Sequence, residues 1–275
     1  MKKLLILVQD HLVHSLRTRR AALFLALYAG VFFLLSYGFI RIQEKISLAL
    51  AERGVDETSR TMVAGMVKGL VKKTGDSQAV DFFFAAPFLN IALFVATILG
   101  TPALILLSKY DLVARETADG SLRYLTFRVS RIQILVSRLV SSVLEYGLIS
   151  LFILAGATLW ARARIASFPL GPSLAAGLGF WLKSQFFLLI FICLALAASV
   201  IVRRSFLALL LSFAVALLFL LLPFWTDYLS PFDPEYLRGL LYPLSPPLYL
   251  TLSAYLVFSA FFFGLAAAIF SRKDL

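Results

Sequence analysis

Several apolar stretches of this chain are too long to be buried helices of a soluble domain. A helix needs about 20 apolar residues to cross the hydrocarbon core of a bilayer, which is roughly 30 Å thick. Hydrophobic residues make up 61% of the 275 residues, whereas a soluble domain is only about 45–50% apolar. The few charged residues fall in groups between the apolar stretches. The sequence therefore predicts an all-α polytopic membrane protein.

The apolar stretches predict six transmembrane helices in one membrane domain that covers residues 1–275. The spans are expected at residues 21–40, 82–108, 132–160, 174–202, 206–225 and 248–270. The segments 41–81 and 227–247 are expected to be outer loops, the first with two short amphipathic helices and the second with one. Asp233 and Pro234 fit the N-cap and the first position of that last helix.

The positions of Lys and Arg indicate that both termini are cytoplasmic. Basic residues predominate on the short segments at one side of the predicted spans, as the positive-inside rule requires of cytoplasmic loops. The formal net charge of +11 follows from this bias and favours contact with anionic lipid headgroups. No basic surface outside the membrane borders indicates a nucleic-acid partner. The expected location is the cytoplasmic (inner) membrane of a bacterium.

Residues 1–20 are expected to form an amphipathic helix on the cytoplasmic surface of the membrane. Apolar side chains recur at helical spacing from Leu4 to Leu16, and polar ones such as Asp10 lie between them. The stretch is too polar to cross the bilayer, so we place it at the interface. The helix closes with the arginine cluster Arg17, Arg19 and Arg20, which also marks the cytoplasmic edge of the first span.

The motifs of an enzyme are missing from the sequence. No glycine is followed by lysine, which excludes the Gly-x-x-x-x-Gly-Lys-[Ser/Thr] loop that binds nucleotides. His11 and His14 have no Cys or third His nearby, so we interpret them as interfacial polar groups rather than metal ligands. Cys193 is the only cysteine and is expected to pack within an apolar run. We therefore expect a non-catalytic chain that binds no cofactor or metal itself.

Two ionisable residues fall inside predicted spans, Glu145 in the third and Lys183 in the fourth. Charged groups are costly in lipid and often line substrate paths, so both residues are candidates for a translocation path. Their depths differ, which argues against a mutual ion pair. Lys183 could instead extend to the outer surface. Glu145 could pair with Arg138, seven residues earlier on nearly the same helical face.

The most informative segment lies between the second and third predicted spans, at residues 109–131. It is expected to leave the membrane as a short helix with acidic and basic residues, turn at Asp119-Gly120, and return as a second amphipathic stretch. An ordinary cytoplasmic loop would explain the arginines by the positive-inside rule. It would not explain the order of the whole pattern.

This order resembles the first cytoplasmic loop of permease subunits of ABC-2-type transporters. In that family the loop carries an acidic residue, Gly-Thr-Leu, a leucine pair, Pro-Val-Ser-Arg and then Gly-Lys. The matching residues are Glu116, Gly120-Ser121-Leu122, Leu125 and Val129-Ser130-Arg131. The chain departs from the pattern where Arg128 replaces the proline and Ser137-Arg138 replaces Gly-Lys. The N-terminal helix, the proline-rich start of the sixth span and the tail Phe270–Leu275 also resemble the family.

The resemblance implies an ATP-driven transporter in which two permeases pair, as a homodimer or with a related chain. Two cytoplasmic ABC ATPase subunits, which hold ATP and Mg²⁺, would bind beneath them. The N-terminal helix is a second expected contact with the ATPase. The residues expected to couple to the ATPase are Asp111, Arg115, Glu116, Asp119, Gly120 and Arg123. Such a permease extrudes a substrate, whose identity stays open, or transmits force to a periplasmic accessory protein.

Two other classes stay open. A membrane scaffold or a secondary transporter would need no ATPase. A secondary transporter usually has internal repeats and coupling-ion groups near the midplane, for which only Glu145 is available. An intramembrane enzyme would need paired acids, a nucleophile with its base, or a metal cluster, and the predicted spans have none of these. Co-purification with an ATP-hydrolysing partner would separate the permease from both alternatives.

Overall fold

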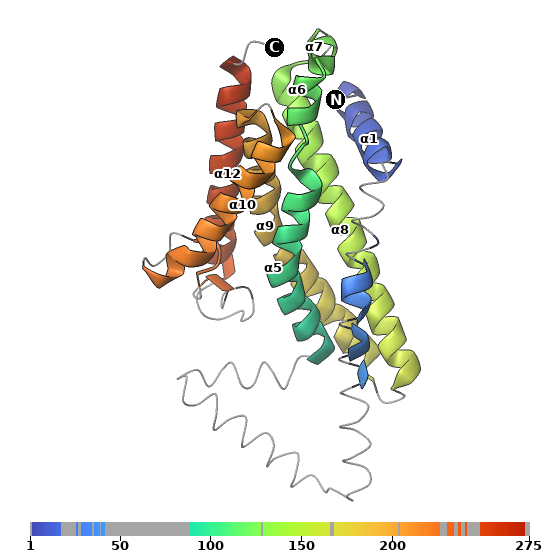
Figure 1. The fold of residues 1–275 in the computed structure, drawn as a ribbon. Helices are drawn as coiled ribbons and strands as arrows, with labels where there is room; N and C mark the ends of the chain where they lie inside the picture. Colours follow the sequence, from blue (N-terminus) through green and yellow to red (C-terminus); the bar gives the residue numbers. More distant parts are fainter. Residues whose placement is uncertain are drawn as a thin grey trace, which may run out of the picture. The chain divides into compact units, whose positions relative to one another are not determined.

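The fold is all-helical over the residues that the computed structural model describes (Figure 1). These residues contain no strand, which confirms the predicted all-α class. They are residues 2–17, 26, 29–34, 36–38, 40–41, 88–127, 129–165, 168–202, 204–225, 230–233, 236–237, 240 and 248–272.

Five helical segments of this described part are long and apolar enough to cross a membrane. This confirms the multi-pass character that the sequence predicts. Four of these segments coincide with α8 (Arg131–Arg164), α9 (Leu170–Ile201), α10 (Ser205–Leu221) with the 3-10 turn η1 (Leu222–Phe224), and α12 (Leu248–Arg272). The other, Leu93–Thr117, begins within α5 (Phe88–Lys109) and extends past its end. Within the first predicted span, Ala29–Gly38 is a shorter apolar helix. The count of six spans and the cytoplasmic position of both termini stay predictions.

Two helices are longer than the predicted spans. α8 includes Arg162 and ends at Arg164, beyond the predicted end of the span at residue 160. α9 begins at Leu170, ahead of the expected start at residue 174, with Pro172 in its first turn. Proline is tolerated there because the first N–H groups of a helix have no acceptor within the helix. Both differences have one cause: charge and proline mark the edge of an apolar stretch, not the end of a helix.

The N-terminal helix α1 (Lys2–Arg17) lies where the sequence predicts an amphipathic helix, and its interfacial position stays a prediction. The two short helices predicted for residues 41–81 lie almost wholly outside the described residues. Of the second predicted outer loop, residues 236–237 and 240 are helical. The Leu237 N–H donates to the Asp233 carbonyl at 3.0 Å, as expected of a helix that starts at Asp233.

The chain divides into two compact units, and α5, α8 and α9 contribute residues to both. The first unit comprises Met1–Tyr28, Thr97–Ile149 and Lys183–Leu275. Its core is the second half of α9, where every residue from Ile190 to Val200 is buried. Aromatic rings pack around this part of α9, with the centroids of Phe187 and Tyr255 5.7 Å apart.

The second unit comprises Ala29–Ala96 and Ser150–Leu182. Its polar side chains bond between helices: Asn90 Nδ2 donates to the Ser173 carbonyl at 2.5 Å, and Trp181 Nε1 donates to Ser150 Oγ at 3.0 Å. Such hydrogen bonds satisfy buried polar donors and acceptors, for which lipid hydrocarbon offers no partner. These bonds therefore fix α5 and α8 against α9 within this unit.

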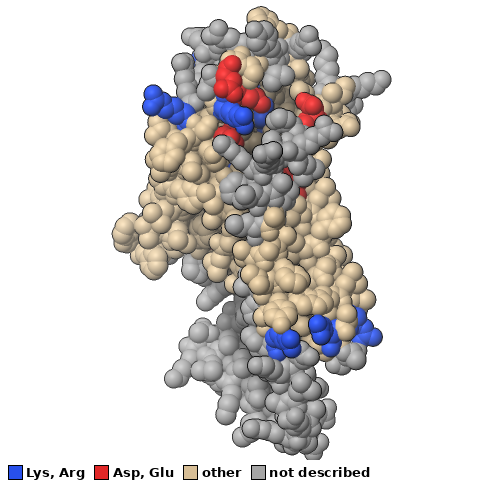
Figure 2. Space-filling view, turned by 45° about the vertical axis from the view of Figure 1, so that its right-hand side comes forward, with Lys and Arg blue, Asp and Glu red and all other residues tan. Residues whose placement is uncertain are grey.

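The surface of the described part is largely apolar. On the face shown in Figure 2, acidic and basic atoms form small groups and most of the described surface is neither. On α10 the only buried residues are Ala208, Ser212 and Phe219. Large apolar side chains are otherwise exposed along it, including Leu210 and Leu217. A helix that exposes leucine along most of its length is suited to lipid rather than to water.

Replacing Ala195 with leucine should destabilise the protein, because Ala195 is fully buried in the middle of α9. Adding methylene groups to a well-packed interior costs about 1–3 kcal/mol. Ala260→Leu is the matched control, since Ala260 is exposed on α12. Thermal unfolding in detergent micelles measures both. Equal unfolding temperatures for the two variants would contradict the central position of α9.

Candidate functional site

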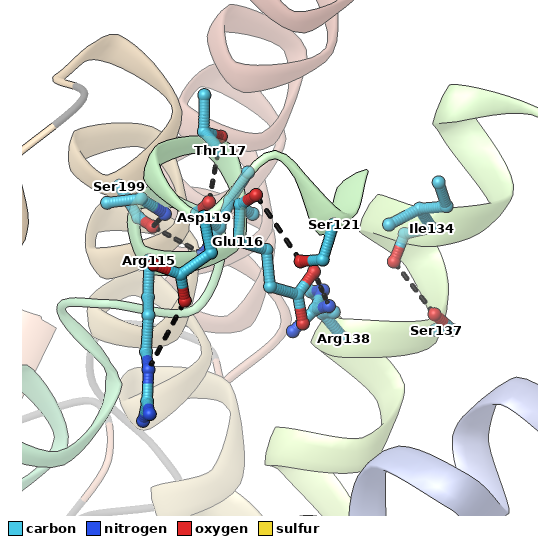
Figure 3. Close-up of polar contacts among 11 residues, drawn as sticks. Arg115, Glu116, Thr117, Asp119, Ser121, Ile134, Ser137, Arg138 and Ser199 are labelled. Carbon is cyan, nitrogen blue, oxygen red and sulfur yellow. Dashed lines mark hydrogen bonds and ion pairs between the residues drawn. The ribbon is translucent and has the colours of Figure 1, made fainter. Parts of the chain in front are cut away.

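The segment between α5 and α8 folds as two short helices joined by a turn, as the sequence predicts (Figure 3). The helices are α6 (Ala114–Ala118) and α7 (Ser121–Thr126). Gly120 lies between them with a φ of 72°, a backbone conformation that glycine adopts without the steric cost met by other residues. The predicted turn at Asp119-Gly120 therefore matches the structure.

The backbone at the start of α6 is buried, whereas the charged side chains of Arg115 within it and Asp119 just after it are exposed. Val113 and Ala114 are fully buried at its beginning. Arg115 and Asp119 have side chains that are 62% and 65% exposed, and Arg115 Nε lies 3.9 Å from Asp119 Oδ2. Such an exposed pair contributes little to stability, so both charges are available to a partner.

The buried start of α6 is held by Ser199 of α9 (Figure 3). Ser199 Oγ accepts hydrogen bonds from the Val113 N–H at 2.6 Å and from the Ala114 N–H at 2.9 Å. These are first-turn donors, which have no acceptor within their own helix. The sequence gives no sign of this contact, because Ser199 stands in an apolar run and its partners precede it by 85 and 86 positions.

The acidic residue of the resemblance, Glu116, has a partner on α8 (Figure 3). Arg138 Nη2 donates to Glu116 Oε2, and Arg138 is buried while Glu116 is partly exposed. A charge-assisted bond of this kind is about twice as strong as a neutral one. It ties α6 to α8, next to the bond that ties α6 to α9.

The pairing expected between Arg138 and Glu145 is wrong, because Glu145 pairs with Lys109. Lys109 Nζ lies 2.5 Å from Glu145 Oε2, and the two side chains are only 4% and 5% exposed. Seven residues along a helix separate Arg138 and Glu145 by about 10.5 Å of rise. Lys109 of the neighbouring helix α5 is closer to Glu145, and Glu116 of α6 is closer to Arg138. The sequence places Lys109 in the cytoplasmic segment, and as the last residue of α5 its side chain is buried within the protein.

Tyr146 of α8 makes further contacts with α5 next to the Lys109–Glu145 ion pair. Lys109 Nζ lies 5.8 Å from the centre of the Tyr146 ring, within range of a cation–π interaction. The Tyr146 hydroxyl bonds to Ser108 Oγ and lies 3.4 Å from the Leu104 carbonyl. A buried ion pair needs such supporting contacts to offset the loss of hydration.

Lys183 is bound near the second outer loop rather than near Glu145. Its Nζ donates to the Leu240 carbonyl at 3.0 Å. Leu240 belongs to the loop predicted to be outside, so the side chain reaches in the direction that the sequence suggests. Glu145 and Lys183 thus have separate partners, and their role in a translocation path stays a prediction.

The arginine that ends the family-like pattern, Arg131, binds the end of α12. Arg131 Nη1 donates to the carbonyls of Phe270 and Ser271 at 3.0 and 2.9 Å. These last carbonyls of a helix lack intrahelical donors, and a basic side chain there also complements the helix dipole. The start of α8 and the end of α12 are therefore joined.

The other predicted residues are placed as follows. Asp111 is half-buried in the turn before α6, and Arg123 belongs to α7 but its side chain is outside the described part. Asp10 is exposed on α1, which ends at Arg17, and Arg19 and Arg20 lie outside the described residues. In the part of the chain that is described, no three His, Cys, Asp or Glu residues are grouped to hold a metal ion.

The chain matches no protein-family model, and no curated protein is similar to it.

Replacing Lys109 with methionine should destabilise the protein by about 3–5 kcal/mol, because it removes the ammonium partner of a buried carboxylate. The double variant Lys109→Met/Glu145→Leu should recover most of the loss, since it removes both charges. Asp119→Ala, at the exposed pair, should change stability by less than about 1 kcal/mol. Denaturant unfolding in micelles compares the three variants. A double variant no more stable than Lys109→Met would contradict a direct ion pair.

Replacing Gly120 with alanine should cost about 1–2 kcal/mol, because a Cβ is disfavoured at positive φ. No atom lies within 4 Å of the Cβ that alanine would add, so the cost is confined to the backbone. Gly179→Ala is the control: Gly179 has the same open surroundings but lies inside α9. That change should be neutral or stabilising. Equal effects on unfolding temperature at both sites would refute the turn conformation.

Proposed function

We propose that this chain is the transmembrane permease subunit of an ATP-driven transporter of the ABC-2 type. The observation that carries the proposal is the α6–Gly120–α7 segment, which exposes the charged side chains of Arg115 and Asp119 while α6 is bonded to α8 and α9. A segment of this kind can receive a force from a partner and pass it to membrane helices. An unanchored loop could not.

The partner in this proposal is a pair of cytoplasmic ABC ATPase subunits, which bind ATP and Mg²⁺. The permease itself has no nucleotide-binding loop, so the energy has to come from another chain. Two permeases, identical or related, would share the ATPase pair in the cytoplasmic membrane of a bacterium. The chain would extrude a substrate or drive a periplasmic accessory protein.

The docking surface is the exposed part of residues 114–127. Arg115 and Asp119 present opposite charges there, and Phe127 is 87% exposed just after α7. Opposite charges set the orientation of a docked partner, and a buried aromatic side chain often provides much of the binding energy. Glu116 is engaged by Arg138, so its first role in this proposal is to hold α6 in place.

The translocation path in this proposal passes near Glu145 and Lys183. Each has a partner within the chain, Lys109 and the Leu240 carbonyl respectively. A substrate would have to displace or move these partners. A charged group in lipid that can exchange partners is a common element of transport paths.

Charge reversal at Arg115 tests the proposal. The permease is co-expressed with candidate ABC ATPases from the same genome, and any complex is purified and assayed for ATP hydrolysis. Arg115→Glu should weaken ATPase binding by about tenfold, the scale of one interfacial charge contact. Arg164→Glu, an exposed arginine at the far end of α8, is the control and should bind normally.

One outcome would contradict the permease assignment and another would contradict the docking surface. A chain that purifies without an ATPase would favour a scaffold or a secondary transporter. Equal ATPase binding by Arg115→Glu and Arg164→Glu would show that the docking surface lies elsewhere.

A further inference from the structure

We propose that Ser199 is the positioning residue that passes displacement of α6 to α9, an inference that rests on the proposed function. Ser199 lies near the end of α9, is fully buried, and caps the first turn of α6 through Val113 and Ala114. The proposal concerns which of the two connections of α6 transmits motion.

The helix α6 needs a cap from outside itself. It has only five residues, and its N-cap residue, Val113, makes no side-chain cap bond. So short a helix is marginal without outside support. Because the Val113 and Ala114 amides are buried, leaving them without an acceptor is unfavourable. The start of α6 should therefore stay bonded to Ser199 when a partner pushes on the exposed side chains of this segment.

The second connection of α6, through Glu116 and Arg138, is less suited to transmit motion. Both side chains have several rotatable bonds, so they can follow a displacement of α6 while α8 stays in place. The serine hydroxyl is joined to the backbone through one carbon atom, so a shift at Ser199 Oγ moves the α9 backbone with it.

The position of Ser199 in α9 completes the argument. It lies within the run of buried residues from Ile190 to Val200, the core of the first unit, one residue before the end of that run. Close-packed interiors have low compressibility and transmit strain to their neighbours. Two other buried hydroxyls bond differently: Ser212 Oγ donates to the Leu209 carbonyl and Ser259 Oγ to the Tyr255 carbonyl, each in its own helix.

Hydrogen exchange tests the cap itself, without reference to transport. In Ser199→Ala the amides of Val113 and Ala114 should exchange about tenfold faster, because they lose their acceptor. Ser199→Thr keeps the hydroxyl and should retain most of the protection. Ser212→Ala is the matched control, since it removes a buried hydroxyl that bonds within α10. Unchanged exchange in Ser199→Ala would overturn the proposal.

A probe on α9 tests transmission in the complex with the ATPase. Leu182 is exposed on α9, so Leu182→Cys in a Cys193→Ala background carries an environment-sensitive fluorophore. ATP binding should change its emission in the otherwise unmodified chain. Ser199→Ala should reduce this change by about threefold or more while ATP binding is retained. Ser199→Thr and Ser212→Ala should respond normally.

The outcomes separate the inference from the proposed function. A chain with Ser199 intact that binds no ATPase would overturn the proposed function and, with it, the transmission role. A normal ATP response in Ser199→Ala would overturn the role of Ser199 alone. A loss of response in Ser212→Ala equal to that in Ser199→Ala would also overturn it, because any buried hydroxyl would then serve.

Discussion

Polar groups inside this protein have to find partners within the chain, because lipid offers none. The backbone meets this requirement by forming helices. Several buried hydroxyls meet it by donating to carbonyls of their own helix, as Ser137, Thr158 and Ser259 do. Others bond between helices, as Asn90 does to Ser173. The second kind fixes one helix against another, so the few such bonds determine how the helices are held.

The two ion pairs on α8 illustrate the same requirement at different depths. Lys109 and Glu145 are both buried, and Tyr146 and Ser108 support them. Glu116 is partly exposed, so its bond to Arg138 is closer to water and more sensitive to salt. The buried Lys109–Glu145 pair holds α5 to α8, and the more exposed Glu116–Arg138 pair holds α6 to α8. Removing the first pair therefore loosens the end of α5, and removing the second loosens α6, both at the connection between α5 and α8.

Much of the fold could be predicted from the sequence, because length and hydropathy alone identify helices that fit a bilayer. The turn at Gly120 was also predictable, since glycine between two charged amphipathic stretches is typical of a positive φ. The pairing of Glu145 could not be predicted. The charge of Lys109 suggested the aqueous side, and only the actual end of α5 shows it to be buried.

The candidate site was predicted in its exposed part and missed in its buried part. Arg115 and Asp119 are expected as coupling residues from the family resemblance, and the structure shows that their side chains are exposed. Ser199 carries no such signal, because one serine in an apolar run is as consistent with a bond to its own helix as with a cap on another. Long-range contacts of this kind depend on how the helices pack against one another. The spacing of apolar residues along the sequence does not reveal that packing.

The caps of α6 and α12 join residues that the ribosome adds to the chain at widely separated times. Translation adds about 5–20 residues per second. Ser199 follows Ala114 by 85 positions, and Phe270 follows Arg131 by 139. The start of α6 therefore waits on the order of 10 s for its cap, and Arg131 waits longer for the last helix. The start of α6 can therefore reach its final form only after α9 has been synthesised, and the start of α8 can bind α12 only after Ser271 has been added.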